Sequence, residues 1–337
     1  MPRRVWRPQT FRGGNVTTDV LLLLAGLAVL VFGAEVLVRS GTNLAARLGI
    51  SPLTIGLTVV AIGTSMPELA VGIDAAARGN PGLAVGNIVG TNLVNILLIL
   101  GLSALIAPIP IARRTLYFDL PLMTVSALAV YFLGRGEMLS TRDAWLLLLI
   151  GVLYTVGVVI LGRREQNGSA KSTLATESES SSTPTRSAFK DVSLLLGSLI
   201  VIVIGADLLV RGSVSIAANL GVSDVVIGLT IVAIGTSAPE LVTTLVATFR
   251  GQRDIAIGNL IGSSVYNIAF VLAITTIVVP GDMPVPAAIR IDLAIVALVS
   301  LACIPVFLTH KTVTRIEGAL FVRAYCAYLG WLIATRT

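Results

Sequence analysis

The chain contains an internal repeat. Residues 33–100 align without a gap onto residues 205–272, at the constant offset of 172 that separates their first positions. Roughly half of the aligned positions are identical, which favours duplication of one structural unit over chance similarity. The repeat is clearest in three pairs of segments: GAEVLVR (33–39) with GADLLVR (205–211), IGLTVVAIGTSMPEL (55–69) with IGLTIVAIGTSAPEL (227–241), and GNIVGTNLVNI (86–96) with GNLIGSSVYNI (258–268). The fold must therefore combine two related units.

Both units are too apolar for a soluble domain. The chain is 55% hydrophobic and 12% charged, with a mean hydropathy of +0.92, whereas a soluble domain carries about 25% charged residues. The net charge of +6 would also suit nucleic acid. The basic residues, however, lie mostly in short loops between apolar runs and are not interleaved with aromatic residues. We expect a lipid bilayer and no nucleic acid as partner, and no protein partner is evident.

Ten apolar segments are predicted to be membrane helices, each near the roughly 20 residues that a helix needs to cross a bilayer. Their predicted limits are 19–38, 51–79, 82–106, 116–133, 142–162, 191–210, 223–250, 254–279, 287–309 and 316–334. Residues 1–18 form a polar N-terminal tail. The first span is expected to be retained, because no A-x-A-like cleavage site follows it closely. Residues 163–190 are rich in Ser, Thr and charge and are predicted to form a flexible linker.

The linker divides the chain into two transmembrane repeats, 19–162 and 191–337, with five predicted spans each. Because five is odd, the second repeat must start on the opposite side of the membrane from the first. This predicts an all-α membrane protein of ten transmembrane helices arranged as two inverted five-helix repeats, as in many secondary transporters. Most Lys and Arg residues lie on the linker's side, so the linker is expected to be cytoplasmic. The compact plan suggests a prokaryotic plasma (inner) membrane.

Each repeat carries the segment G-T-S-x-P-E, which ends at Glu68 in the first copy and at Glu240 in the second. Both glutamates lie near the middle of a predicted span. A carboxylate at that depth costs several kcal/mol unless it has a partner, so it marks a functional site by default.

A proline precedes each glutamate. Pro67 and Pro239 remove a backbone donor and clash with the carbonyl four residues back. Irregular backbone at membrane depth survives only where it lines a cavity or is buried in protein. The freed carbonyls, the Thr and Ser hydroxyls and the carboxylates are all oxygen donors, of which Ca²⁺ takes six to eight. One kinked helix beside a glutamate would be ordinary packing, but two matching copies favour a cation site.

The span after each glutamate adds polar side chains at helical i, i+4, i+8 spacing, which places them on one face. They are Asn87, Thr91 and Asn95 in the first repeat, and Asn259, Ser263 and Asn267 in the second. Gly86, Gly90, Gly258 and Gly262 would let helices approach closely there. We therefore expect the two repeats to meet near the bilayer midplane in an oxygen-rich site with two negative charges.

The remaining acids have simpler interpretations. Glu35 and Asp207 each precede an arginine by four residues, which predicts local ion pairs. Asp119 and Asp292 are predicted to open spans four and nine, where a carboxylate suits a helix N-terminus. His310 is the only histidine, and the two cysteines lie in apolar stretches, so a zinc-type site is not expected.

At this point the sequence resembles the sodium/calcium exchanger branch of the cation/Ca²⁺ antiporters, over about residues 19–334. The paired GTSxPE segments carry the resemblance, and the two hallmark alpha repeats of that family correspond to 51–101 and 223–273. The proton-coupled branch more often has G-N-x-x-E at this point. The resemblance implies ten helices and alternating access at a central site.

The resemblance also implies roles for individual residues. Glu68 and Glu240 would be the main Ca²⁺ ligands and would share in Na⁺ binding. Backbone carbonyls around Ala61, Thr64, Ala233 and Thr236 would complete the cage; Ser65, Ser237, Thr91 and Ser263 would serve outer Na⁺ positions; Asn95 and Asn267 would lie between the glutamates. Some microbial relatives carry Asp where Asn267 stands, so this chain has two fixed carboxylates where they have three.

We therefore expect a secondary antiporter that moves Ca²⁺ against Na⁺, with no cofactor and no enzymatic activity. One alternative is a Ca²⁺/H⁺ antiporter on the same fold, in which Glu68 and Glu240 would carry protons. A second is a passive cation channel, which would need weak multi-site binding. A third is an intramembrane enzyme, for which the sequence offers no nucleophile–base combination.

Overall fold

A computed structural model describes residues 16–77, 79, 81–173, 188–220, 233–278 and 281–336. These residues are almost entirely helical. The first half contains α1 (Val16–Leu48), α2 (Pro52–Ile55), η1 (Gly56–Val60), α3 (Ala61–Thr64), α4 (Met66–Ala77), α5 (Pro81–Leu93), η2 (Val94–Ile99), α6 (Leu100–Ile106), β1 (Ile109–Pro110), η3 (Thr115–Asp119), α7 (Leu120–Gly134), β2 (Met138–Leu139) and α8 (Thr141–Thr173).

The second half repeats this pattern of long helices interrupted by short π-helical segments, which are labelled η. It contains α9 (Ala188–Asn219), α11 (Ala233–Thr236), α12 (Ala238–Phe249), α13 (Arg253–Tyr266), η5 (Asn267–Leu272), α14 (Ala273–Val278), β3 (Met283–Pro284), α15 (Ala287–His310), β4 (Thr312–Val313) and α16 (Arg315–Arg336). Within the described residues, nine helical runs are long and apolar enough to cross a membrane. The chain is a multi-pass, all-helical membrane protein.

Helix ends differ from the predicted spans in several places. The predicted first span, 19–38, is too short, because α1 continues to Leu48, and α9 likewise continues past residue 210 to Asn219. Helix α8 continues to Thr173 and α9 begins at Ala188, so helix occupies both ends of the predicted 163–190 linker. Residues 174–187 lie outside the described part of the chain, as do residues 221–232 at the start of the predicted seventh span.

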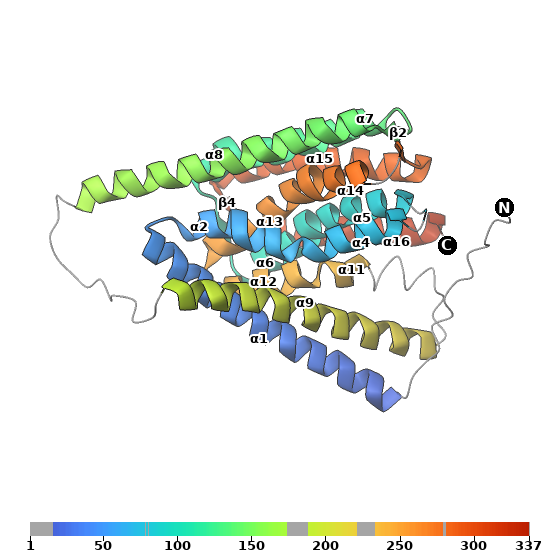
Figure 1. Cartoon of the computed structure of the whole chain (residues 1–337), viewed down its shortest axis with the longest axis horizontal. Coiled ribbons are helices and arrows are strands. Elements are labelled where there is room, and N and C mark those ends of the chain that lie inside the picture. The colour runs from blue at the N-terminus through green and yellow to red at the C-terminus, as the bar shows by residue number, and fades with distance from the viewer. Residues whose placement is uncertain are drawn as a thin grey trace.

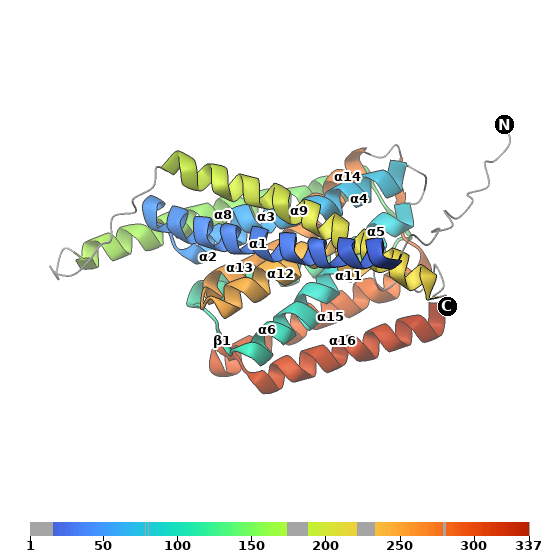
Figure 2. The same ribbon diagram turned by 90° about the horizontal axis from the view of Figure 1, so that it is seen from below.

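The extra length of α1 and α9 is stabilised by contacts between these two helices, which lie side by side (Figures 1 and 2). Arg47 Nε lies 2.5 Å from a carboxylate oxygen of Asp191 at one end, and Asn219 Nδ2 donates to Asp19 Oδ2 at 3.1 Å at the other. Between the ends, glycines allow close backbone contact. A Cβ atom at Gly205 would lie 2.7 Å from the backbone nitrogen of Leu30.

The centre of the molecule is formed by corresponding segments of the two repeats. In the runs Pro81–Ile106 and Arg253–Val278, 78% of the most apolar window is buried, compared with 28% for α1 and α9. Outward-facing side chains such as Phe32, Leu298 and Leu320 are large, apolar and exposed. This distribution suits a lipid-facing shell around a protein-filled core.

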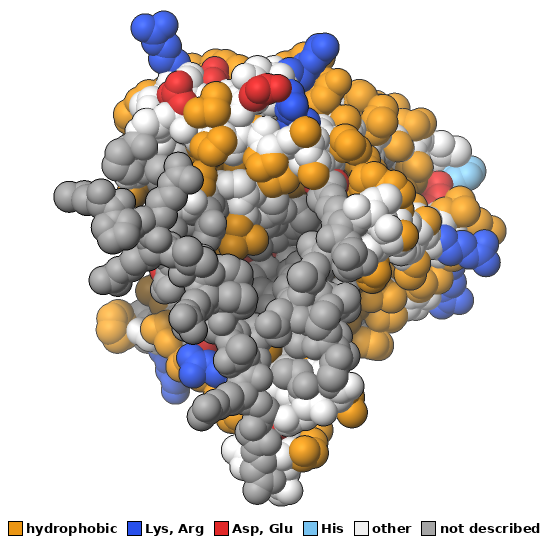
Figure 3. Space-filling view, turned by 90° about the vertical axis from the view of Figure 1, so that its right-hand side faces the viewer, with side chains coloured by type: hydrophobic (Ala, Val, Ile, Leu, Met, Phe, Trp, Pro, Cys, Tyr) orange, Lys and Arg blue, Asp and Glu red, His pale blue; other side chains and the backbone are white. Residues whose placement is uncertain are grey.

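Short strands join the two repeats at both ends. β1 pairs antiparallel with β4, with Ile109 opposite Val313, and β2 pairs with β3, with Leu139 opposite Met283. Figure 1 shows that α1 begins and α16 ends at one end of the molecule, whereas α8 ends and α9 begins toward the other. Figure 3 looks onto the first of these ends: acidic and basic side chains gather along its upper edge, and hydrophobic side chains cover the right-hand flank.

The α1–α9 contact generates a stability prediction. Replacing Gly205 by Ala places a methyl group against the Leu30 backbone and should destabilise the folded protein by about 1–3 kcal/mol through overpacking. Gly197→Ala on the same helix is the matched control, because a Cβ there meets nothing within 4 Å among the described residues. Thermal unfolding of both purified variants should show a lower Tm for Gly205→Ala only. Equal Tm values would contradict the close contact.

Candidate cation-binding site

The helix of each GTSxPE segment is broken at its serine. Ser65, with φ −84° and ψ 2°, separates α3 from α4, and Ser237, with φ −86° and ψ 7°, separates α11 from α12. The cause lies two residues further on, where Pro67 and Pro239 cannot donate to the preceding turn. The predicted interruption of both helices is therefore found at equivalent positions.

Each break places a glutamate in the first turn of a new helix. Glu68 lies in the first turn of α4 and Glu240 in that of α12, where the partial positive charge of the helix N-terminus favours a carboxylate. Both side chains are completely buried. Among the described residues, neither oxygen of Glu68 nor Oε2 of Glu240 has a hydrogen-bond partner, while Glu240 Oε1 accepts a long bond of 3.4 Å from Ser65 Oγ. These carboxylates lack the direct partners that buried charges usually have.

Hydroxyl and amide groups connect the two repeats around the glutamates. Thr64 Oγ1 donates to Asn259 Oδ1 at 3.1 Å, and its repeat equivalent Thr236 donates to Asn87 Oδ1 at 3.4 Å. The 172-residue offset relates Thr64 to Thr236 and Asn87 to Asn259, so the two contacts are equivalent. In each of them a threonine of one repeat donates to an asparagine of the other repeat. The site is thus built between the repeats.

Further contacts join predicted ligands. Ser237 Oγ donates to Thr91 Oγ1 at 3.3 Å. Ser263 Oγ lies 3.4 Å from Thr64 Oγ1 and donates to the carbonyl of Ala61 at 3.4 Å. The structure brings these predicted residues together, while Ala233 begins α11 and its side chain lies outside the described part.

Asn95 and Asn267 belong to the π-helical segments η2 and η5 of the central helices. Both are completely buried, and no polar atom of either amide has a partner among the described residues. π-Helical segments frequently occur at functional sites. The sequence predicted the asparagine face, but it gave no signal for the π-helical geometry that carries these two residues.

Glycines bring the central helix of the second repeat against the broken helix of the first. A Cβ at Gly258 would lie 2.9 Å from the carbonyl oxygen of Leu53, and one at Gly262 would lie 2.7 Å from Cβ of Ala61. The predicted close approach is therefore confirmed for these two. At Gly86 a Cβ would lie 3.3 Å from the side chain of Ile289, and at Gly90 a Cβ meets nothing within 4 Å among the described residues, so the described part of the chain shows no close backbone approach at these two.

The prediction for two other acids was wrong. Asp119 and Asp292 do not open their helices, because η3 begins four residues earlier at Thr115 and α15 begins five residues earlier at Ala287. Asp119 is completely buried and lies 3.9 Å from Arg114 Nε, so a neighbouring arginine rather than a helix N-terminus is its electrostatic partner.

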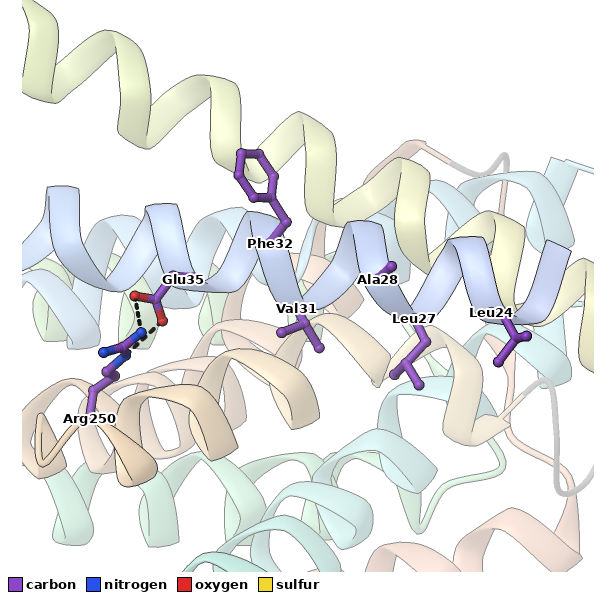
Figure 4. Close-up of a pocket in the computed structure, with 7 residues that line it drawn as sticks. All are labelled: Leu24, Leu27, Ala28, Val31, Phe32, Glu35 and Arg250. Atoms are coloured by element: carbon purple, nitrogen blue, oxygen red, sulfur yellow. Dashed lines mark hydrogen bonds and ion pairs between the residues drawn. The ribbon is translucent and has the colours of Figure 1, made fainter. Parts of the chain in front are cut away.

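The predicted local ion pairs are confirmed. Arg39 Nε lies 2.5 Å from Glu35, and Arg211 Nε lies 2.8 Å from Asp207. The sequence missed a second partner for Glu35: Arg250, at the end of α12, also binds it at 2.6 Å and so ties α1 to the helix that carries Glu240 (Figure 4). The same figure shows the apolar α1 side chains that line an open cavity of about 500 Å³ beside this pair.

Two buried hydroxyls on α12 were not among the predicted site residues. Thr243 and Thr244 follow Glu240 by three and four residues and are completely buried. Polar residues at this spacing share the helix face of the glutamate, which was the available signal. The predicted site was built from polar residues that occur in both repeats, and the first repeat has Val71 and Gly72 at these two positions.

The donor types indicate which ions the site suits. In the part of the chain that the structure describes, no group of three or more His, Cys, Asp or Glu side chains could hold a metal ion. The site offers instead carboxylate, amide, hydroxyl and carbonyl oxygens. Such donors favour hard cations of the Na⁺ and Ca²⁺ kind over zinc or copper.

Multi-pass helices with paired breaks and buried glutamates define a membrane transporter of the cation antiporter class. The chain belongs to the sodium/calcium exchanger protein family, whose sequence profile matches residues 18–160 and 190–334. This is a family of transporters rather than of enzymes.

Known proteins similar to this chain include two curated relatives. The sodium/calcium exchanger MaX1 of Methanosarcina acetivorans is 32% identical, over 93% of this chain and 98% of its own length. The inner membrane protein YrbG of Escherichia coli is 38% identical, over 83% and 86%. A solved structure of the sodium-calcium exchanger NCX_Mj soaked with Na⁺ superposes with a TM-score of 0.79 and 30% identity, covering 96% of this chain and 100% of that one.

The unpartnered carboxylates predict that cations stabilise the fold. In buffer with K⁺ as the only other cation, Ca²⁺ at a hundred times its dissociation constant should add about 2.7 kcal/mol to the unfolding free energy. Glu68→Gln should abolish this increment, and in chelator it should unfold no more easily than the unsubstituted protein, because the Glu68 carboxylate has no hydrogen-bond partner to lose among the described residues.

Thermal unfolding with and without Ca²⁺ measures both effects. Asp207→Asn is the control, since it removes an exposed carboxylate of another membrane helix and should leave the Ca²⁺ increment intact. A full Ca²⁺ increment in Glu68→Gln would count against a site at Glu68.

Proposed function

We propose that this protein exchanges Ca²⁺ for Na⁺ across the membrane, by alternating access at one site near the bilayer midplane. The observation that carries the proposal is the pair of fully buried glutamates, Glu68 and Glu240, which lie at equivalent helix breaks and have three of their four carboxylate oxygens unpartnered among the described residues. Carboxylates in this setting are costly unless a cation neutralises them. The arrangement is explained if a cation is the missing partner.

The proposed ligands fall into three groups around the two carboxylates. Carbonyl oxygens at Ala61, Thr64, Ala233 and Thr236, hydroxyls of Ser65, Ser237, Thr91 and Ser263, and amides of Asn95 and Asn267 complete the donor set. Ca²⁺ takes six to eight such oxygens in flexible geometry. Na⁺ is also a hard cation, so the two ions would compete for overlapping positions.

Charge neutralisation would couple the two fluxes. With no cation bound, two carboxylates would have to move through the conformational change in a medium of low dielectric, which is unfavourable. With Ca²⁺ or Na⁺ bound, the cost falls. The protein would therefore change sides mainly when loaded, and one ion would leave only in exchange for the other.

The conformational change would use the architecture of two inverted five-helix repeats. In support, α1 begins and α16 ends at one end of the molecule while α8 and α9 approach the other, so each half crosses an odd number of times (Figure 1). The threonine–asparagine contacts exchanged between the repeats also fit a two-fold relation. We propose that the α1–α9 pair slides as a unit past the core, because few of its residues are buried and its own ends are tied together.

The relatives support the same substrates and membrane. MaX1 is named a sodium/calcium exchanger, and the NCX_Mj structures concern ion exchange in crystals soaked with Na⁺, Ca²⁺ or Sr²⁺. YrbG is named an inner membrane protein. We place this protein in a prokaryotic inner membrane with the segment between α8 and α9 on the cytoplasmic side, where Lys and Arg are most frequent.

The decisive experiment is ⁴⁵Ca²⁺ uptake into proteoliposomes under an outward Na⁺ gradient, an equal K⁺ gradient, or a pH gradient alone. Uptake should occur only with the Na⁺ gradient. Glu68→Gln and Glu240→Gln should each reduce it at least a hundredfold, because each removes a charge that the bound ion must neutralise, while Asp207→Asn should transport normally.

Other outcomes would point elsewhere. Uptake driven by the pH gradient without Na⁺ would make the protein a Ca²⁺/H⁺ antiporter. Flux without any counter-ion would indicate a channel. Normal exchange in both glutamine variants would disprove the site.

A further inference from the structure

The two repeats differ one turn beyond each glutamate. After Glu240 the chain places Thr244, and the equivalent residue after Glu68 is Gly72. Thr244 is completely buried on α12. The site therefore has a hydroxyl in one half that the other half lacks.

In the second half, this hydroxyl belongs to a chain of hydrogen bonds. Asn259 Nδ2 donates to Thr244 Oγ1 at 3.0 Å, and Asn259 Oδ1 accepts from Thr64 Oγ1 at 3.1 Å. Both ends of the buried amide are therefore satisfied. The chain runs from α12 through α13 to the end of α3, where Thr64 is a proposed ligand and lies 3.4 Å from Ser263.

In the first half, the equivalent amide is held at one end only. Asn87 Oδ1 accepts from Thr236 at 3.4 Å, but Asn87 Nδ2 is buried and has no partner among the described residues. Gly72, at the position equivalent to Thr244, has no side chain that could accept a hydrogen bond from Asn87 Nδ2. A Cβ at this position would lie 2.9 Å from Thr275 Oγ1, so a threonine there would require the Thr275 side chain to shift.

We infer that Thr244 is a positioning residue that fixes Asn259, and through it Thr64, in the geometry needed for cation binding. This rests on the proposed function. The pair Thr64 and Ser263 is thereby ordered before the ion arrives, whereas the equivalent pair in the other half, Thr236 and Thr91, adjusts on binding. Preorganised ligands avoid the ordering cost that would otherwise reduce affinity.

Removing the hydroxyl should weaken ion binding more than it slows transport. Thr244→Val keeps the shape but leaves Asn259 Nδ2 without an acceptor, so the amide can no longer hold Thr64. We expect the Ca²⁺ dissociation constant of the purified protein, measured by calorimetry, and the half-saturating concentration in proteoliposomes to rise about three- to tenfold. The maximal exchange rate per folded protein should stay within twofold.

Two variants serve as controls. Thr244→Ser retains the hydroxyl and should restore affinity to within twofold of the unsubstituted protein. Thr248→Val makes the same change one turn along α12, where the hydroxyl donates to the backbone carbonyl of Thr244 at 2.8 Å, and should leave affinity unchanged. If Thr244→Val does not give folded protein, Thr244→Ala takes its place with the same expectation.

A double-mutant cycle tests whether Thr244 acts through Asn259. Asn259→Ala should weaken binding by itself, and adding Thr244→Val should weaken it no further. Three results would each overturn this inference while leaving the proposed function in place. Thr244→Val could bind Ca²⁺ as tightly as the unsubstituted protein, or it could weaken binding as much in the Asn259→Ala variant as in the unsubstituted protein. Thr244→Ser could also fail to restore binding. Absence of Ca²⁺ binding by the unsubstituted protein would remove the proposed function and this inference with it.

Discussion

The structure depends on burying two carboxylates at membrane depth. Glu68 and Glu240 are fully enclosed, although an isolated charge in a medium of low dielectric is among the least favourable groups that a fold can contain. Each is placed at a helix N-terminus, and that terminus exists only because a proline interrupts the helix. Backbone broken in this way tolerates membrane depth only inside protein, so the central helices must surround both breaks. Among the described spans, the most buried are the central runs Pro81–Ile106 and Arg253–Val278.

Duplication supplies this arrangement twice but does not make its halves equal. The threonine–asparagine contacts between the repeats are reciprocal, with Thr64 on Asn259 and Thr236 on Asn87. Thr244, however, completes the hydrogen bonding in one half only, since Gly72 stands at the equivalent position and packs against the Thr275 side chain. Under the proposed exchange of Ca²⁺ for Na⁺, one firm and one adjustable half-site would serve two ions of different charge.

The outer helices meet different physical demands from the core. α1 and α9 expose large apolar side chains and contact each other through glycines, with an ion pair at one end and an amide–carboxylate bond at the other. The Glu35–Arg250 pair is a polar link between these helices and the core, because it joins α1 to the helix of Glu240 (Figure 4). An exposed ion pair of this kind contributes modestly to stability, so it can be broken and remade.

The sequence by itself determined the membrane class, the duplication, the two helix breaks and the identity of the buried glutamates. These features are local: proline interrupts a helix wherever it stands, and an apolar run of about 20 residues is stable only in lipid or protein. Only the tertiary structure decided what lies opposite each group. It extended α1 and α9 beyond their apolar runs, gave Glu35 a second arginine, and moved Asp119 from a helix start to the side of Arg114. It also joined Thr244 to Thr64 through Asn259, across three helices. Such partners are set by packing between segments far apart in the chain, and no spacing rule within one segment encodes them.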